Sequence, residues 1–200
     1  MARRSEHSQE QIREMVIKSA EAIVIQDGVK ALTVRKIAVD IGYTVGSIYM
    51  VFANMQDLIT HIKLRTLTEL ADYLRVDQQH DPSQQLHELA DQYLSFAQQH
   101  FNRWQIVFEP LETHDHDVPE GYKNQIEQLF IPIEGLLKQL RPAAEPDQLA
   151  LAARAIWSAV HGVCILYLNG NLGRVGLNKA QPAVYLLVEN FIQGWQASSV

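Results

Sequence analysis

The chain has 200 residues, of which 47% are hydrophobic and 20% are charged. This composition excludes a disordered tail protein and predicts one or two globular units with an apolar core. The formal net charge is -6, so the chain as a whole lacks the cationic excess that is typical of a nucleic-acid binder.

The charge is unevenly distributed along the chain. Residues 1–65 carry nine basic and seven acidic side chains, net +2, whereas residues 66–200 carry eight and 16, net -8. This asymmetry indicates a polyanionic partner for the first part only.

A single cysteine, Cys164, and the absence of a signal peptide predict a cytoplasmic protein. The longest apolar stretches, such as 155–168, are interrupted and shorter than the ~20 residues of a membrane span, so we expect no membrane partner.

The first half of the chain predicts four helices. Apolar residues at helical spacing predict a helix over 9–27, which Gly28 ends. Thr33 and Gly42 are typical of the start and the end of a helix of two turns. Thr44 is a second hydroxyl cap before residues 45–51, and Asn54 opens a fourth helix that runs to about Val76.

The second half continues the helical pattern. A polar break at 77–82 precedes predicted helices over 86–97 and 101–108. A polar loop over 112–120 then leads to a helix over 122–140, which Pro132 should kink or split. The last two helices cover 147–168 and 182–195. With about nine helices and no credible strand, the predicted class is all-α.

Residues 33–52 predict two short helices joined by a glycine-containing turn, a pair that fits the major groove of DNA. Helices of seven or eight residues are marginal alone, so they need the first helix as a support. Its apolar stripe matches the buried face offered by Val34, Ile37, Ile48 and Phe52. The sequence therefore predicts a three-helix, DNA-reading head.

The run from Leu32 to Phe52, LTVRKIAVDIGYTVGSIYMVF, resembles the TetR family of bacterial transcription regulators. The matching features are Thr33, Ile37-Ala38, Gly42, Thr44, Gly46-Ser47-Ile48-Tyr49 and Phe52. The resemblance covers residues 9 to about 62, and the remainder agrees in length and helical class only. It implies a helix-turn-helix DNA-binding domain over 1–54 and a helical effector-binding and dimerisation domain over 55–200. The implied assembly is a homodimer on a near-palindromic double-stranded DNA operator.

The resemblance also implies that DNA is contacted by residues in and before the recognition helix. These residues are Thr33, Arg35, Lys36, Thr44, Val45, Gly46, Ser47, Tyr49 and Met50. Arg35 is the single residue near that helix whose guanidinium can donate two hydrogen bonds to a guanine edge. Two alternatives remain open: Tyr49 packs between helices, and Arg35 and Lys36 form a solvated face.

The chain departs from the family at Val45, Met50, Val51 and Met55, where family members commonly carry Lys, His or Tyr. We expect weaker, less salt-sensitive DNA binding, because phosphate contacts are lost. Val45 and Met50 would then touch thymine methyl groups. Arg3 and Arg4 are either a flexible arm on the DNA or a disordered, solubilising start.

The resemblance implies that the last two helices form the dimer face, and their apolar stripes fit this interpretation. The residues concerned are Ile156, Val160, Val184, Leu187, Val188, Phe191 and Trp195. Large residues on other segments are candidates for an effector pocket. They are Tyr93, Phe96, Trp104, Phe108, Trp157 and His161. The alternative for both sets is ordinary core. Residues 157–162 also resemble a Trp, His-Gly signature of one C-terminal subgroup.

Three further patterns carry no chemistry. The His114-Asp-His-Asp117 run alternates along a flexible segment and is more typical of a solvated loop than of a metal site. His87-Glu88 lacks the second His of a zinc-protease motif, since Asp91 stands there. Cys164 lies in an apolar helix, where a thiol is inert. We therefore predict no catalytic residue, no metal and no cofactor.

The sequence predicts a bacterial, ligand-responsive transcription regulator, a repressor released from its operator by a small apolar or aromatic effector. The alternative is a helical enzyme or small-ligand carrier without DNA binding. Salt-dependent binding to a promoter fragment separates the two.

Overall fold

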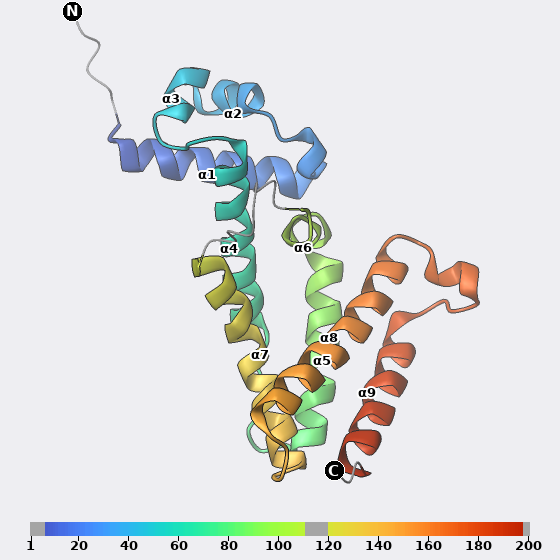
Figure 1. Ribbon diagram of the computed structural model, residues 1–200. Helices are drawn as coiled ribbons and strands as arrows, with labels where there is room; N and C mark the ends of the chain where they lie inside the picture. Colours follow the sequence, from blue (N-terminus) through green and yellow to red (C-terminus); the bar gives the residue numbers. More distant parts are fainter. Residues whose placement is uncertain (1–6, 111–119, 198–200) are drawn as a thin grey trace, which may run out of the picture. The chain divides into compact units, whose positions relative to one another are not determined.

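The protein is described here by a computed structural model, which covers residues 7–110 and 120–197. Across these residues all regular structure is helical, with nine α-helices and two short 3-10 helices, so the predicted all-α class is confirmed (Figure 1). In chain order the elements are α1 (Gln9–Asp27), η1 (Val29–Ala31), α2 (Val34–Ile41), α3 (Val45–Tyr49), α4 (Met55–Tyr73), α5 (Pro82–Gln99), α6 (Phe101–Val107), α7 (Glu120–Leu140), α8 (Pro146–Leu168), η2 (Leu172–Val175) and α9 (Ala180–Ala197).

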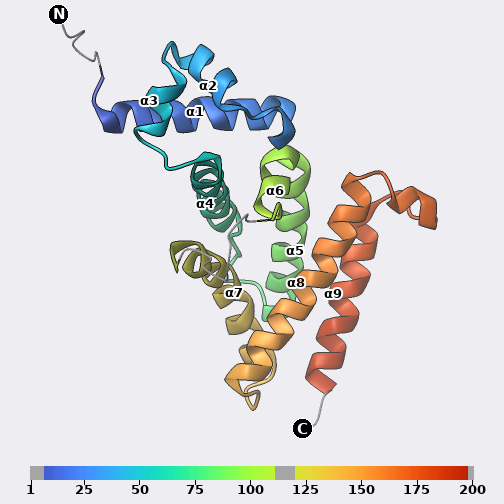
Figure 2. The same cartoon turned by 45° about the horizontal axis from the view of Figure 1, so that its top comes forward.

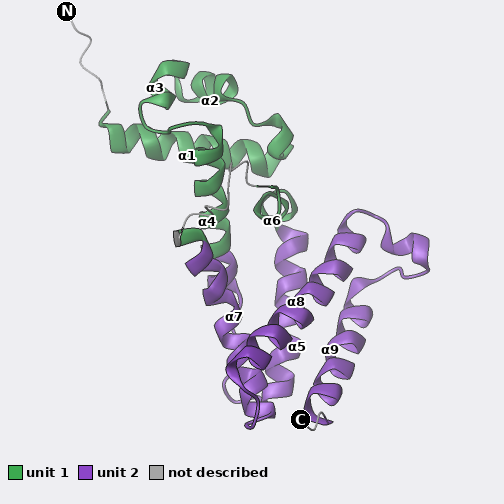
Figure 3. Ribbon diagram, viewed as in Figure 1, with its two compact units in different colours: residues 1–67, 100–122 green, residues 68–99, 123–200 purple. Residues whose placement is uncertain are grey.

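The chain divides into two compact units (Figure 3). The first comprises residues 1–67 and 100–122, and the second comprises residues 68–99 and 123–200. The first unit therefore contains α1 to α3, most of α4 and the short α6. The second contains α5, α8, α9 and most of α7.

In the first unit, α2 and α3 lie on one side of α1 (Figures 1 and 2). The apolar stripe of α1 includes Val16 and Val24, which are fully buried. Ile37 from α2 and Ile48 from α3 complete the same core, together with Phe52. The short helices are therefore held by burial against a long one, as isolated helices of their length require.

The ends of these helices follow the caps predicted from the sequence. The Thr33 hydroxyl accepts a hydrogen bond from the Lys36 backbone N–H, and Thr44 does the same for Ser47. Gly42 ends α2 at φ 71°, a left-handed conformation that residues with a Cβ rarely adopt. Asn54 accepts from the Asp57 N–H at 2.9 Å and so opens α4.

Several boundaries differ from the predicted ones. The third helix ends at Tyr49 and continues as a turn, and α4 ends at Tyr73, three residues before the predicted Val76. Pro132 does not split α7, which is continuous from Glu120 to Leu140. Most of the predicted polar loop at 112–120 lies outside the described residues.

In the second unit, α5, α8 and α9 pack against one another. Leu94 of α5, Ala153 and Cys164 of α8, and Val188 of α9 are buried. The α8 helix has 23 residues and a mean hydropathy of 1.7 in its most apolar window, so by length and composition alone it could cross a membrane. The sequence-based argument counted only residues 155–168 and is wrong, because the whole helix from Pro146 to Leu168 is long and apolar enough. One such helix is weak evidence, since the core helices of globular proteins pass the same test.

Candidate functional site

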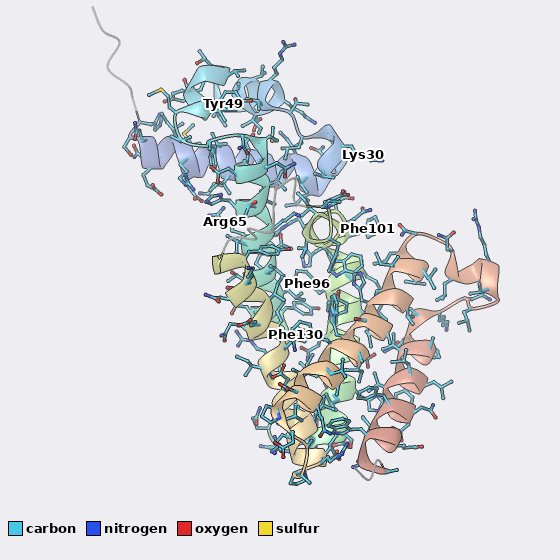
Figure 4. All side chains as sticks on the ribbon, viewed as in Figure 1. Lys30, Tyr49, Arg65, Phe96, Phe101 and Phe130 are labelled. Atoms are coloured by element: carbon cyan, nitrogen blue, oxygen red, sulfur yellow. The ribbon has the colours of Figure 1, made fainter. Side chains whose placement is uncertain are left out.

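The α2 and α3 helices present a small outward face on the first unit. Tyr49 and Met50 are exposed, with 51% and 70% of their surface accessible, whereas Ile48 is buried in the core of the first unit. Gly46 is exposed on the same face, and a Cβ added there would meet only the Thr44 hydroxyl, at 3.7 Å. Figure 4 labels Tyr49 on this face. The packing alternative for Tyr49 is thus not supported in the chain alone.

The hydroxyl groups predicted to contact DNA are engaged in helix caps. Thr44 Oγ1 lies 2.9 Å from Ser47 Oγ and accepts from the Ser47 N–H at 3.2 Å. Thr33 Oγ1 accepts from the Lys36 N–H at 3.2 Å. Both threonines remain exposed, so each hydroxyl can still add a contact on its outer side.

The two cations of α2 differ in their surroundings. Lys36 Nζ lies 2.5 Å from Asp27 Oδ2, at the end of α1. Arg35 is exposed and forms no ion pair with any residue in the described part of the chain. Its guanidinium is therefore available for a phosphate or a base edge, while the charge of Lys36 is partly neutralised.

The positions that depart from the family divide into two kinds. Val45, Val51 and Met55 are partly buried and pack against the core of the first unit. Met50 stands apart from this core and points to solvent. The first three side chains thus serve the fold, and Met50 is the member of the set that is free for a partner.

A network that the sequence reasoning missed ties the turn after α3 to α1 and α4. The Arg13 guanidinium donates to the Val51 carbonyl at 2.7 Å, lies 4.6 Å from the Phe52 ring centre, and contacts Nε2 of His61. His61 Nδ1 in turn lies 2.7 Å from the Asp57 carbonyl oxygen. Arg13 lies 38 residues before Val51 and 48 before His61, so no local pattern signals its contacts.

A second link joins α1 to α4 further along both helices. Arg65 donates to Glu14 at 2.8 Å and to Glu21 at 3.1 Å. The hydrogen bond from Arg65 lowers the pKa of the Glu14 carboxyl. Together with the Arg13 network, it fixes the orientation of the first part of α4 beneath α1.

Four of the candidate effector residues lie in the second unit. The Tyr93 hydroxyl and His161 Nδ1 are 2.8 Å apart, and the Trp157 ring stacks on the His161 ring at 5.1 Å. Phe130, which the sequence did not single out and which Figure 4 labels, meets Trp157 edge to face at 5.7 Å. Burial lowers the pKa of the His161 imidazole and so favours its neutral form. Phe96 is fully buried and contacts Tyr73.

The other two candidates, Trp104 and Phe108, lie in the first unit. Their rings meet edge to face at 5.2 Å; Trp104 is buried and Phe108 is exposed. The same unit contains Lys63, whose side chain is fully buried and donates to the Glu109 carbonyl. Burial lowers the pKa of the Lys63 ammonium. No motif in the sequence distinguishes this lysine from an exposed one.

The predicted dimer residues lie mostly inside their own unit. Ile156, Val160, Val184 and Val188 are at most 5% exposed, a position that favours the ordinary-core alternative for these four. Leu187, Phe191 and Trp195 are half-buried, and the Trp195 indole donates to the Leu137 carbonyl at 3.0 Å.

The outward side of α8 is a different stripe. Its members recur every three or four residues, have small or apolar side chains and are exposed, except for the half-buried Gly162. They are Leu151, Ala155, Ala159, Gly162 and Leu166. Tyr185 and Leu186 of α9 are also exposed, at 57% and 63%.

The remaining predicted features carry no site in the described residues. Arg3, Arg4 and the His114–Asp117 run lie outside the described residues. His87 lies 3.1 Å from Glu189 and stacks on Tyr185. Burial raises the pKa of the Cys164 thiol to about 12. Across 7–110 and 120–197, no group of three His, Cys, Asp or Glu side chains is arranged to hold a metal ion.

Comparisons with known families agree with this architecture. The family model described as "Bacterial regulatory proteins, tetR family" matches residues 16–62, and the one described as "Tetracyclin repressor-like, C-terminal domain" matches residues 86–191. The chain therefore belongs to the TetR family of transcription regulators, with an N-terminal DNA-binding domain. Such regulators are not enzymes, so the enzyme alternative is set aside. No curated protein sequence matches the chain.

Solved structures share the fold over nearly the whole chain. A protein of unknown function from Rhodococcus sp. RHA1 has a TM-score of 0.74 and 17% identity, over 97% of this chain and 98% of that one. A TetR-family transcriptional regulator from Streptomyces coelicolor has a TM-score of 0.69 and 17% identity, over 96% and 84%. BioQ, solved with its natural double-stranded DNA operator, has a TM-score of 0.65 and 18% identity, over 93% and 98%. At these identities the likeness shows the fold.

Proposed function

We propose that this regulator is a cytoplasmic, homodimeric repressor that leaves its operator when a small apolar or aromatic effector binds. The operator is held by the outward face of α2 and α3, with Arg35 and Tyr49 as the main polar contacts. Operator binding is supported by the exposed position of both side chains on a helix pair that is anchored to the core of the first unit. BioQ, which shares the fold, is a protein solved on its operator.

The effector part rests on the cluster of Tyr93, Trp157, His161 and Phe130. The rings of Tyr93 and Trp157 contact the His161 imidazole, and Phe130 packs against Trp157, a composition typical of a site for small organic ligands. The neutral imidazole that burial favours suits an uncharged or weakly polar compound better than an anion.

The repressor mechanism follows from linkage. An effector that prefers a conformation unsuited to two successive major grooves, ~34 Å apart, must weaken DNA binding. DNA weakens effector binding by the same free energy. Neither ligand needs to touch the other.

The homodimer part is supported by the exposed α8 stripe. Small residues let two helices approach closely, and Leu151 and Leu166 would add apolar area at each end. Because a two-fold interface uses the same patch twice, a self-complementary stripe of this kind suits it.

The experiment starts from operator fragments selected from the source genome with the full-length protein. A panel of hydrophobic compounds is then screened for a rise in melting temperature and for a loss of operator affinity. We expect one compound class to do both, and Tyr93→Phe to weaken the effect of the compound while DNA binding stays. Tyr185→Phe, on the exposed side of α9, is the matched control. A screen in which stabilising compounds leave operator affinity unchanged would contradict the repressor mechanism.

A further inference from the structure

The outward face of α3 carries no charge. Residues 44–51 contain neither an acidic nor a basic side chain. Residues three and four apart share one helix face, so Gly46, Tyr49 and Met50 lie together, on the side away from Ile48. Met50 still has helical backbone angles, φ -76° and ψ -22°, so it continues this face. DNA recognition by α3 therefore cannot depend on side-chain charge.

Hydrogen-bonding capacity on this face is also small. The hydroxyls of Thr44 and Ser47 bond to each other at 2.9 Å, and the Thr44 hydroxyl also caps the helix. The Tyr49 phenol is the remaining polar group that projects from the exposed face. What α3 mainly offers to a groove is apolar surface.

Met50 supplies the largest share of this apolar surface. Its exposed fraction is 70%, and it is not among the side chains that pack on the core of the first unit, as Val45 and Val51 are. A thioether on an unbranched chain adapts to an irregular surface at little conformational cost. The apolar group that the major groove presents on base edges is the 5-methyl group of thymine.

We propose that Met50 is a specificity-determining residue that reads the operator by packing its thioether against the 5-methyl group of a thymine in the major groove. The inference rests on the proposed function, operator binding by the face of α2 and α3. It names the chemistry of the base pair that α3 selects: an A·T pair, recognised by its methyl group instead of by hydrogen bonds. Val45, which the sequence paired with Met50 in this role, packs on the core instead.

The test uses the full-length protein and an operator selected from a random duplex library. Each thymine of the operator is replaced in turn by deoxyuridine, which removes the methyl group and keeps the base-pairing edge. We expect one thymine in each half-site to be sensitive, with Kd rising about fourfold, the effect of one methyl-sized group returned to water. At that position Met50→Ala should bind thymine and uracil operators equally, whereas Met50→Leu should keep part of the difference.

Val175→Ala is the matched control, because Val175 is equally exposed, at 67%, but belongs to the second unit. It should leave the thymine-to-uracil ratio unchanged. If no thymine is sensitive, or if Met50→Ala keeps the full ratio, the inference is overturned while operator binding stands. If the wild-type protein selects no sequence at all, the proposed function fails, and the inference fails with it.

Discussion

The fold of α3 does not require a glycine at position 46. A Cβ at this position would meet only the Thr44 hydroxyl, at ordinary van der Waals distance. We predict that Gly46→Ala raises the free energy of unfolding by about 0.5 kcal/mol, because alanine loses less backbone entropy in a helix. The same change should weaken operator binding about tenfold, since the added methyl group stands between the helix and the DNA backbone.

The two effects are separated by chemical denaturation and by fluorescence anisotropy with labelled operator. Gly135→Ala in α7 is the control, because Gly135 is also exposed, helical and surrounded by open space. It should add stability and leave DNA binding unchanged. Equal operator affinity for wild-type and Gly46→Ala protein would mean that DNA does not approach α3 at this residue.

Lys63 is a buried cation with a neutral carbonyl as its hydrogen-bond acceptor. Because burial lowers its pKa from the usual 10.5, the folded protein releases this proton at a lower pH than the unfolded chain does. Between the lowered pKa and 10.5 the unfolded state binds more protons, so stability from this group rises with pH. We predict that the rise is absent in Lys63→Met.

Urea denaturation at several pH values between 7 and 10 measures this difference. At pH 7 the methionine variant should be as stable as the wild-type protein or more stable, because an apolar chain of similar length replaces a buried charge. An identical pH dependence in both proteins would show that Lys63 is hydrated in the folded state.

At the scale of elements, α3 depends on its cap more than a longer helix would. It has five residues, and the Thr44 hydroxyl accepts the Ser47 N–H at its start. We predict that Thr44→Ala lowers the free energy of unfolding by about 1 kcal/mol. Thr44→Ser should retain most of this energy. Denaturation curves of the two variants check the prediction, and a loss of the same size in Thr44→Ser would assign it to the threonine methyl group instead.

The sequence predicts the elements of the first unit well because their signals are local. Caps such as Thr33, Thr44 and Asn54 act within three residues, and Gly42 ends a helix by its own backbone conformation. Pro132 shows the limit of this reasoning. A proline removes one hydrogen bond from a helix, and whether the helix breaks depends on the packing around it, which no local pattern records.

Contacts between distant elements explain what sequence reasoning missed. The hydrogen bond from Lys63 to the Glu109 carbonyl joins residues 46 apart. The one between Tyr93 and His161 joins residues 68 apart, and although the sequence names both as pocket candidates, it does not predict this bond. The α8 helix gives the clearest case. Its strongest apolar stripe, with Ile156 and Val160, faces its own unit, while the side free for a partner holds small residues. Hydrophobicity alone does not separate a dimer contact from the core, since the interior of a chain also selects large apolar residues.

For the whole molecule, the exposed α8 stripe predicts the oligomeric state. We expect the protein to sediment with the mass of two chains of 22.7 kDa. Ala159→Glu places a charge in the middle of the stripe. The charge is exposed to solvent in the single chain but would be buried in the dimer, so the variant should shift the equilibrium to monomers. Ala143→Glu, in the exposed turn between α7 and α8, is the control. A dimer that persists in Ala159→Glu would place the interface elsewhere.

The net negative charge of the whole chain affects how strongly DNA binding depends on salt. With a net charge of -6 and no cation on α3, few phosphates can be neutralised. The slope of log K against log salt reports their number at about 0.9 per contact. We predict a shallow slope for the wild-type protein. In Arg35→Ala the slope should decrease by the value of about one phosphate contact in each subunit. Fluorescence anisotropy across a salt series measures both slopes. An unchanged slope in this variant would mean that Arg35 contacts no phosphate and belongs to a solvated surface.

In the proposed complex the outward face of α3 lies against the operator, and photocrosslinking can detect this contact. A benzoylphenylalanine is placed at Tyr49, which is 51% exposed, and for comparison at Tyr185, which is 57% exposed on α9. We expect an ultraviolet-dependent crosslink to the selected operator duplex from position 49 and none from position 185. Crosslinking from position 185 alone, with position 49 silent on an operator that the protein still binds, would contradict it.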